Sequence, residues 1–267
     1  MVRIWPFIFI WTLCLNMPYG AFAAVKCNRI FRVAVIQNEP LYFLDKNKKV
    51  TGVMLEVTQE LHRRTGCSFD LIEMVRPSMV HRLKGGSVDL SILTIKTDEL
   101  DKAGKFIRVF KANRALISTP ALKKKNYVLK DVLEDKNVLV GGLISSPAFL
   151  NENEVSLLKK QGRWRQYPDY ESIFQSMKRD QIQAFVGSIM VSDFYFKKLG
   201  LSDFGFLIDR SKQSDAGFYY AKQRLTTHEV ELLSSTLAQM LKDGFFQKVL
   251  SKYSSPYAVE NEFVSVN

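Results

Sequence analysis

The sequence has few of the side chains on which metal sites and nucleophilic enzymes depend. Its 267 residues include 3 cysteines and 3 histidines. No two cysteines have the CxxC spacing, and His62, His81 and His228 form no recognisable ligand cluster. No Ser-His-Asp or Cys-His arrangement is visible either. We therefore expect no metal ion, no cofactor and no catalytic residue.

A hydrophobic run long enough to cross a membrane is missing from the start of the chain. The apolar run from Trp5 to Leu15 spans 11 residues, whereas a membrane-spanning helix needs roughly 20. Arg3 precedes the run, and Pro18 and a small-residue site that ends at Ala23 follow it. This order is typical of a secretory signal peptide, residues 1–23, with cleavage after Ala23. A retained membrane anchor is the alternative that the short run disfavours, so we expect a periplasmic protein.

Acidic residues are fewer than basic ones. Lysine and arginine number 38 against 27 aspartates and glutamates, and Arg3 is the one charged residue in 1–23. Removing that segment leaves 37 basic and 27 acidic side chains, a formal charge of +10. Such a charge suits nucleic acid, anionic lipid or an anionic ligand. Because the basic residues are spread along the chain, we favour a solvated basic face and expect no nucleic acid partner.

Two cysteines, Cys27 and Cys67, remain after the expected cleavage, in a compartment that permits oxidation. Each lies just before a predicted strand, so the two sulfurs start from the same edge of one sheet if those strands are parallel neighbours. We predict a disulfide between them. It closes a loop of about 40 residues, which stabilises the fold by about 4 kcal/mol in the chain-entropy model.

Hydrophobic periodicity in the first part of the mature chain predicts a strand, a helix and a second strand. Residues 31–36 are almost continuously apolar, and apolar residues repeat at helical spacing over 53–65. Gly66 stands where helices commonly end, and a second strand follows over 68–74. Strands that alternate with helices predict an α/β fold with a mostly parallel, helix-covered sheet.

The alternation continues and then restarts, which predicts a second sheet of similar size. Two apolar extended stretches flank the second predicted sheet, 114–121 before it and 217–221 after it. We interpret them as hinge strands between two lobes. The other predicted elements are helix 78–84, strand 88–94, helix 129–134, strand 137–141, a helix opening at Pro147, strand 164–167, helix 170–179, strand 184–186, and helices 189–198, 227–242 and 245–253.

Several local motifs occur in an order that resembles one protein family. Residues 39–43 (EPLYF) and 50–53 (VTGV) are similar to the loop and turn before that family's first helix. Residues 83–89 (LKGGSVD) are similar to the lead into its third strand, and 241–253 to its last two helices. Together they resemble the family 3 solute-binding proteins, type II periplasmic proteins that serve polar amino acid ABC transporters.

The resemblance covers nearly all of residues 29–254 and implies a two-lobed type II periplasmic-binding-protein fold. In that fold each lobe is a mostly parallel sheet covered by helices, and two hinge strands join the lobes. Lobe 1 would comprise residues 24–117 and 218–267, and lobe 2 residues 118–217. The resemblance also implies a monomer whose closed state is recognised by an ABC permease.

Two positions depart from the family's pattern. Amino acid binders of the family carry an arginine for the ligand carboxylate in the segment that aligns with 94–100 (TIKTDEL), and Leu100 stands in its place here. Those binders also carry an acidic residue for the ligand ammonium after the strand that aligns with 184–186, where this chain has Gly187 and Ser188. Both departures disfavour an ordinary α-amino acid, so we expect a small polar or anionic solute.

Ligands of open parallel sheets bind beyond the carboxyl ends of the strands. That rule selects the candidate ligand-binding residues Glu39, Tyr42, Arg76, Thr94, Lys96, Ser145, Ser146 and Ser188. Arg76 would be either a replacement clamp for an anion or a solvated surface charge. Glu39 would attract a cation, and Tyr42 would stack on a ligand or pack in its own loop.

The loop that ends at Ser146 is a second candidate feature. Ser146 and Pro147 suit the first positions of a helix, and a helix N-terminus presents free N–H groups that can bind a carboxylate or phosphate. The same two residues can also serve as a purely structural cap.

From these observations we expect a protein that closes around its ligand and catalyses no reaction. One alternative is a ligand-sensing accessory protein for a membrane receptor. The other is a dehydratase-like periplasmic enzyme on the same fold, for which Glu39 is the one carboxylate among the candidates.

Overall fold

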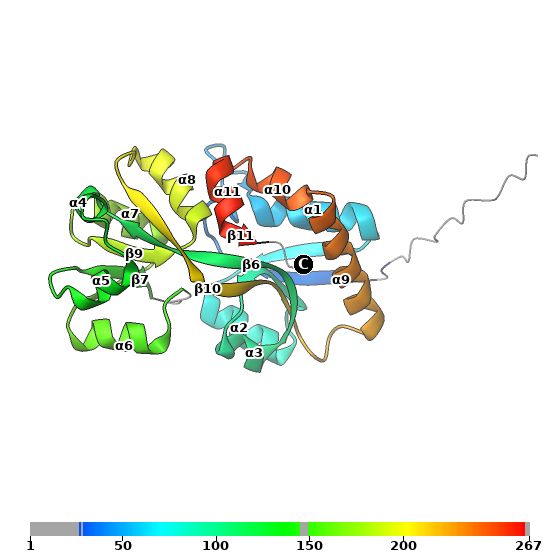
Figure 1. Cartoon of the computed structure of the whole chain (residues 1–267). Coiled ribbons are helices and arrows are strands. Elements are labelled where there is room, and N and C mark those ends of the chain that lie inside the picture. Colours follow the sequence, from blue (N-terminus) through cyan, green and yellow to red (C-terminus); the bar gives the residue numbers. More distant parts are fainter. Residues whose placement is uncertain (1–26, 28, 145–148, 265–267) are drawn as a thin grey trace, which may run out of the picture.

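Two lobes lie side by side in the computed structural model, which describes Cys27 and residues 29–144 and 149–264. The expected signal peptide, 1–23, lies outside the described residues. Strands β6 (Lys105–Ser118) and β10 (Gly205–Tyr220) run from one lobe into the other (Figure 1). Both are much longer than the hinge stretches predicted at 114–121 and 217–221. They make one continuous sheet in the order β4-β1-β5-β10-β6-β9-β7-β8, where two separate sheets were predicted.

Lobe 1 is built on three parallel strands. Strand β1 (Ile30–Val35) pairs in parallel with β4 (Ser68–Glu73) and with β5 (Leu90–Ile95). A short hairpin, β2 (Phe43–Leu44) and β3 (Val50–Thr51), follows β1. The helices are α1 (Val53–Thr65), α2 (Arg76–Gly85), α3 (Asp98–Ala103), α9 (Thr227–Lys242) and α10 (Phe245–Leu250), and they cover both faces of the strands (Figure 1).

Helix α1 shows why the periodicity identified these elements. Its predicted bounds are confirmed, and Val53, Val57 and Leu61 are fully buried against the sheet. Gly66 ends the helix with a left-handed backbone, φ 68°, which glycine adopts without the steric conflict that a Cβ would cause.

The predicted disulfide between Cys27 and Cys67 is confirmed, with the two Cα atoms 4.7 Å apart. The parallel pairing of β1 with β4 brings the two cysteines to the same edge of the sheet. Asp89 ties the neighbouring β5 to β1, because its buried carboxylate accepts the backbone N–H of Arg32 at 2.8 Å and the Nε of Arg224 at 3.0 Å. The outer part of lobe 1 is therefore held both covalently and by a buried ionic group.

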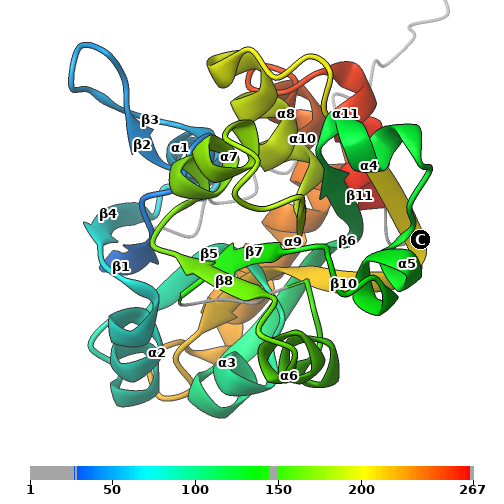
Figure 2. The same ribbon diagram turned by 90° about the vertical axis from the view of Figure 1, so that its left-hand side faces the viewer.

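Lobe 2 is built on three parallel strands of its own, β7 (Val140–Leu143), β8 (Trp164–Tyr167) and β9 (Ala184–Gly187). Figure 2 views this lobe from its outer end. Its helices are α4 (Pro120–Lys124), α5 (Leu129–Glu134), α6 (Glu152–Lys160), α7 (Tyr170–Lys178) and α8 (Ile189–Leu199).

The helix predicted to open at Pro147 begins later. Pro147 lies outside the described residues, and α6 starts at Glu152. The reason is a reciprocal capping box in which Asn151 accepts the N–H of Glu154 and Glu154 accepts the N–H of Asn151. Asn151 therefore caps α6, and the predicted cap Ser146 lies outside the described residues.

The C-terminal segment was not predicted and connects the lobes a third time. After α10, helix α11 (Pro256–Glu262) packs against α8 of lobe 2, and β11 (Phe263–Val264) pairs with β6. Figures 1 and 2 show α11 beside α8. The Asp193 carboxylate on α8 accepts the backbone N–H of Ser255 at 2.7 Å and the hydroxyls of Ser255 and Ser254.

Candidate functional site

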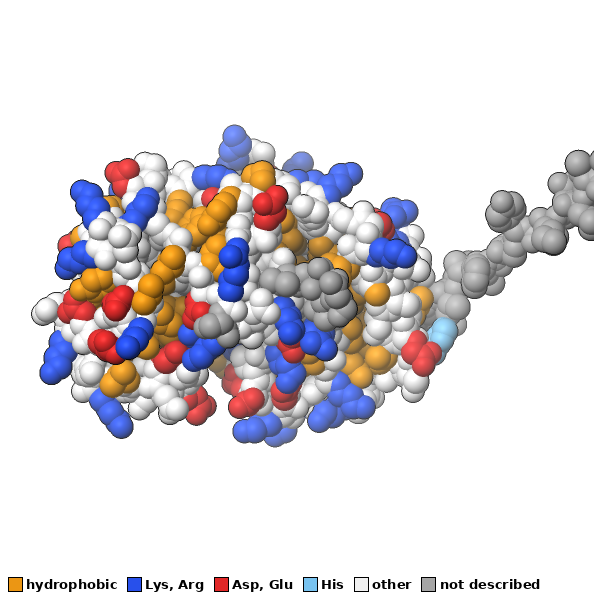
Figure 3. All heavy atoms as spheres, in the orientation of Figure 1, with side chains coloured by type: hydrophobic (Ala, Val, Ile, Leu, Met, Phe, Trp, Pro, Cys, Tyr) orange, Lys and Arg blue, Asp and Glu red, His pale blue; other side chains and the backbone are white. Residues whose placement is uncertain are grey.

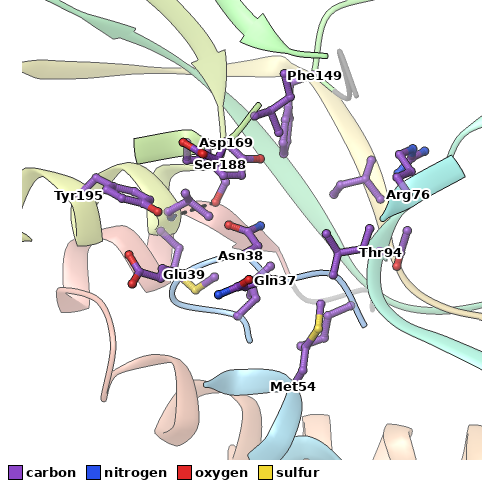
Figure 4. A pocket seen from close by; sticks show the side chains of 18 of the residues that line it. Gln37, Asn38, Glu39, Met54, Arg76, Thr94, Phe149, Asp169, Ser188 and Tyr195 are labelled. Atoms are coloured by element: carbon purple, nitrogen blue, oxygen red, sulfur yellow. Dashed lines mark hydrogen bonds between the residues drawn. The ribbon is translucent and has the colours of Figure 1, made fainter. Parts of the chain in front are cut away.

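A cavity of about 880 Å³ lies between the lobes. Lobe 1 lines it with residues that follow β1, with the start of α2 and with the end of β5. Lobe 2 lines it with the loop from β8 into α7 and with the start of α8. These are the carboxyl ends of parallel strands, where open α/β sheets bind their ligands. Figure 4 shows side chains from both lobes around this space.

The structure brings four of the predicted site residues to this cavity, namely Glu39, Arg76, Thr94 and Ser188. Tyr42 is 6% exposed and packs in the core of lobe 1, away from the lining. Lys96 also lies off the lining, with its Nζ 2.6 Å from the Asp101 carboxylate. Ser145 and Ser146 lie outside the described residues. Ligand binding by each of these residues stays a prediction.

Arg76 is held at the lobe 1 wall by neighbours that leave its charge only partly compensated. Its guanidinium donates to the Thr97 hydroxyl at 3.2 Å and lies 3.5 Å from the carboxylate of Glu99, a side chain that is 57% exposed. The Arg76 side chain itself is 11% exposed. Leu100, which stands where the family carries its arginine, is fully buried in the core with Met79 and Leu83. Arg76 is therefore a lining cation that reaches the cavity from a different strand end.

Glu39 takes part in an ionic contact that bridges the lobes. The Nζ of Lys198 on α8 lies 2.6 Å from the Glu39 carboxylate and 2.9 Å from that of Glu171 on α7. Burial raises the pKa of Tyr195, and the nearby Glu39 carboxylate raises it further. The carboxylate of Glu39 is thus engaged by lobe 2 side chains.

Aromatic side chains make up much of the lobe 2 wall. Phe149, Tyr167, Tyr170 and Tyr195 all line the cavity. Burial and the Glu262 carboxylate raise the pKa of Tyr170 to about 12, while Arg76 acts in the opposite direction. The Tyr170 hydroxyl therefore lies within electrostatic range of a carboxylate and of the lobe 1 arginine.

Ser188 begins α8 and brings a carboxylate of the C-terminal segment with it. Its hydroxyl accepts the backbone N–H of Val191 at 3.1 Å, which caps the helix. The same helix start donates the N–H of Met190 to Glu262 at 2.6 Å. The position where the family carries its acidic residue thus has a serine, with a glutamate from the end of the chain beside it.

Asp169, Tyr170 and Glu262 are among the lining residues that sequence reasoning missed. Asp169 and Tyr170 follow β8 directly, so the strand-end rule would have found them had it been applied to that strand. Glu262 follows the last predicted helix by nine residues and lies next to no predicted strand end. No local pattern indicated it, because its position depends on how α11 packs against α8.

Metal-binding and membrane-spanning features were searched over the same described residues. No group of three or more His, Cys, Asp or Glu side chains there could hold a metal ion. No helix among those residues is both long enough and apolar enough to cross a membrane.

The two lobes, their connecting strands and the cavity between them define a type II periplasmic binding protein. The chain belongs to the bacterial extracellular solute-binding proteins, family 3, whose model matches residues 31–256. The family resemblance that the sequence motifs suggested is thereby confirmed.

Individual relatives are distant in sequence. A probable histidine-binding protein of Campylobacter jejuni is 22% identical over 235 residues, which cover 83% of this chain and 84% of the relative. A putative ABC transporter binding component from Wolinella succinogenes, solved with lysine, superposes with a TM-score of 0.74 at 16% identity and covers 86% of this chain and 97% of its own. An ancestral arginine-binding protein bound to arginine superposes with a TM-score of 0.67 at 21% sequence identity. This match covers 84% of this chain and 97% of the ancestral protein. The structural matches establish the fold.

Proposed function

We propose that this protein captures a small polar solute with an anionic group in the interlobe cavity, in the periplasm, and delivers it to an ABC transporter permease. The observation that carries the proposal is the cavity itself, which both lobes line at the carboxyl ends of their strands. A solute that touches both lobes has more contacts when they are closed, and this difference in affinity drives closure.

The long connecting strands fit such a movement. The register of β10 against β6 shifts between Asp209 and Gln213, where regular pairing is interrupted at the middle of the connection. We place the lobe boundaries within these two strands, with 24–117 and 218–267 in lobe 1 and 118–217 in lobe 2.

Delivery to a permease is supported by the family and by the Wolinella structure, whose title describes a binding component of an ABC transporter. Binding rather than catalysis is supported by the state of Glu39. This carboxylate was the candidate acid or base, and it is engaged in an ion pair with the Nζ of Lys198 at 2.6 Å. Figure 3 shows lysines and arginines scattered over one face of the molecule, as expected for a solvated basic surface.

Arg76 is our candidate for the anion-binding residue, because a guanidinium can pair with a carboxylate through two parallel hydrogen bonds. Replacing Arg76 with Ala should weaken binding of an anionic solute by tenfold to a hundredfold, since hydrogen bonds to charged groups contribute about 1.5–3 kcal/mol. Arg82→Ala is the matched control, because Arg82 is an exposed residue of the same helix outside the lining.

The measurement is a thermal-shift and calorimetric screen of residues 24–267 against amino acids, small dicarboxylates, phosphate, sugars and polyamines. A solute at about 100 times its dissociation constant should add about 2.7 kcal/mol to the free energy of unfolding. If no solute raises the melting temperature, the proposal fails. If an anionic solute binds Arg76→Ala as tightly as the wild type, Arg76 is not its clamp.

A further inference from the structure

The carboxylate of Glu262 is a buried charge at the cavity wall without a cationic partner. Glu262 is the last residue of α11, is 3% exposed and lines the cavity. The Met190 N–H donates to it at 2.6 Å, and the Ser188 hydroxyl and Ile189 N–H also hydrogen-bond to it. Among the described residues, no Lys, Arg or His side chain forms an ion pair with Glu262. Hydrogen bonds from one helix start are therefore all that stabilise this charge.

These hydrogen bonds do not fully compensate for the loss of water. Burial raises the pKa of the Glu262 carboxyl to about 7, although the Ser188 hydroxyl and the two backbone N–H groups lower it. Near neutral pH the empty site thus holds this carboxyl in both protonation states. A positive charge brought next to it would favour the ionised form.

Several charged groups on the elements packed around Glu262 form ion pairs with other residues. Asp193 on α8 pairs with Lys197, and Arg114 on β6 pairs with Asp209 and Glu154. Of the groups that face Glu262, Tyr170 on α7 stays neutral because its pKa is raised to about 12. The remaining titratable or charged side chains on these elements are Glu171 and Lys178 of α7 with Arg179 at its end, Tyr195 and Lys198 of α8, Lys105, Arg108 and Lys111 of β6, Asp209, Arg210, Lys212, Asp215, Tyr219 and Tyr220 of β10, and Tyr257 and Glu260 of α11.

A second acceptor in the same cavity has no hydrogen-bond donor at all among the described residues. The Oδ1 atom of Asn38, in the loop after β1, is buried and has no hydrogen-bond partner among the described residues. Asn38 lines the cavity and lies between the Ser188 side and the Met54 side of it in Figure 4. A buried carbonyl oxygen without a partner is unfavourable, so a ligand donor at this place would be stabilised. Lobe 1 and the C-terminal segment each leave one acceptor for the same ligand.

We propose that Glu262 receives the cationic group of the bound solute, with the Asn38 carbonyl oxygen as a second acceptor. The inference rests on the proposed function, because it requires that the cavity binds a solute. With Arg76 as the cation on the opposite wall of the cavity, the site then recognises a molecule that carries both a protonated amine or amidine and an anionic group. The acidic residue that the family carries after β9 is replaced by one from the end of the chain.

Binding of such a solute is coupled to a proton. The solute's positive charge holds Glu262 ionised, so binding below pH 7 releases the proton that the empty site carries. The affinity should be constant above pH 7 and should fall by up to tenfold per pH unit below it. Between pH 8 and pH 5 the loss is about 50- to 100-fold.

The test is titration calorimetry of residues 24–267 with L-lysine, L-arginine and L-glutamine, whose charges are constant between pH 5 and 8. Hexanoate and succinate lack the cation, and cadaverine lacks the anion. We expect a zwitterion to bind most tightly and its affinity to fall below pH 7 as described. Calorimetry in two buffers of different ionisation enthalpy measures the proton release. Glu262→Gln should weaken it at least tenfold at pH 8 and remove the pH dependence, whereas the exposed control Glu260→Gln should do neither.

The outcomes separate the two proposals. If hexanoate or succinate binds as tightly as every zwitterion, or if zwitterion binding releases no proton between pH 5 and 7, the role of Glu262 is overturned while solute binding stands. The proton-release measurement uses the wild type, so it decides the question even if Glu262→Gln does not fold. If none of these probes and no solute of the wider screen binds, both proposals fail.

Discussion

The two walls of the cavity are built differently. Lobe 1 forms its wall from loops that directly follow its own strands, and the β1–β4 pair beneath them is tied by the Cys27–Cys67 disulfide. Lobe 2 contains no cysteine, and its wall is completed by Glu262 from a segment that follows lobe 1's last helices. One wall is thus fixed by its own sheet, and the other depends on the packing of α11 against α8.

Both walls carry charges of both signs: Arg76 and Glu39 line the lobe 1 side, and Arg179, Asp169 and Glu171 line the lobe 2 side together with Glu262. The binding mode proposed above uses the guanidinium of Arg76 from one wall and the carboxylate of Glu262 from the other. A ligand that pairs with both residues is held at opposite ends by opposite charges and contacts both walls, and contact with both walls favours closure. Three substitutions test this comparison. They remove the Cys27–Cys67 disulfide, the Glu262 carboxylate and the Lys198–Glu39 ion pair.

The largest effect should come from removing the disulfide of lobe 1. Replacing both Cys27 and Cys67 with Ser should lower the free energy of unfolding by about 4 kcal/mol, because the bridge closes a loop of 40 residues in the unfolded chain. Urea unfolding followed by far-ultraviolet circular dichroism measures the loss. Wild-type protein unfolded with a reductant should show the same loss and serves as the control.

Trp164, the one tryptophan left after the expected cleavage, reports on lobe 2 in the same experiment. Its fluorescence transition should shift together with the circular dichroism, since β6 and β10 join both lobes in one sheet. If the Trp164 transition of the disulfide-free variant stays at the wild-type midpoint, the two lobes unfold independently. The disulfide would then stabilise lobe 1 alone.

The fold was largely predictable because its signals are local. Helices α1, α5 and α9 have the predicted bounds, and each carries its own apolar periodicity or cap. The same holds for strand β8. The sequence analysis missed α3, α4 and α11, which are helices of six, five and seven residues, although it found the six-residue α5. The lengths of β6 and β10 depend on partners far away in the sequence, so no local pattern could give them.

The site was predictable on lobe 1 and only partly on lobe 2. The strand-end rule selected Glu39, Arg76 and Thr94 because each lies at or just after the end of a strand that is itself recognisable. Lys96 obeys the same rule but is turned to Asp101, a residue of the unpredicted α3. Glu262 depends on the tertiary contact between α11 and α8, which strand-end spacing cannot reveal.

The second largest effect should be the pH dependence of the lobe 2 wall. The folded-state pKa of Glu262, about 7, exceeds its ordinary value of 4.5, so between these pH values the folded protein holds a proton that the unfolded chain has lost. This contribution to stability is fully present below pH 4.5 and is lost as the pH rises through 7, a change of about 3 kcal/mol. Glu262→Gln should not show this loss and should exceed the wild type in stability most clearly at pH 8.

Urea unfolding at several pH values between 4.5 and 8 measures this difference. Glu260→Gln lies on the same helix but is exposed, so its stability should follow the wild-type curve at every pH. If the curves of wild type and Glu262→Gln run parallel over the whole range, the carboxylate is not held near neutrality by its burial, and the proton-coupled binding proposed above loses its basis.

The smallest effect should come from the ion pair that joins the two walls. Lys198 lies 2.6 Å from Glu39 across the lobes, and its side chain is 35% exposed, so the pair contributes at most about 1 kcal/mol. Lys198→Met should therefore change the free energy of unfolding by less than this. It should nevertheless shift the lobes toward the open form and weaken solute binding by at most about fivefold, because the pair exists only when the lobes approach.

Small-angle scattering of the empty protein should show a larger radius of gyration for Lys198→Met. The control Lys197→Met breaks a pair with Asp193 inside the same helix and should leave the radius unchanged. Equal scattering from both variants would mean that the packing of α11 against α8, and not this ion pair, sets the distance between the walls.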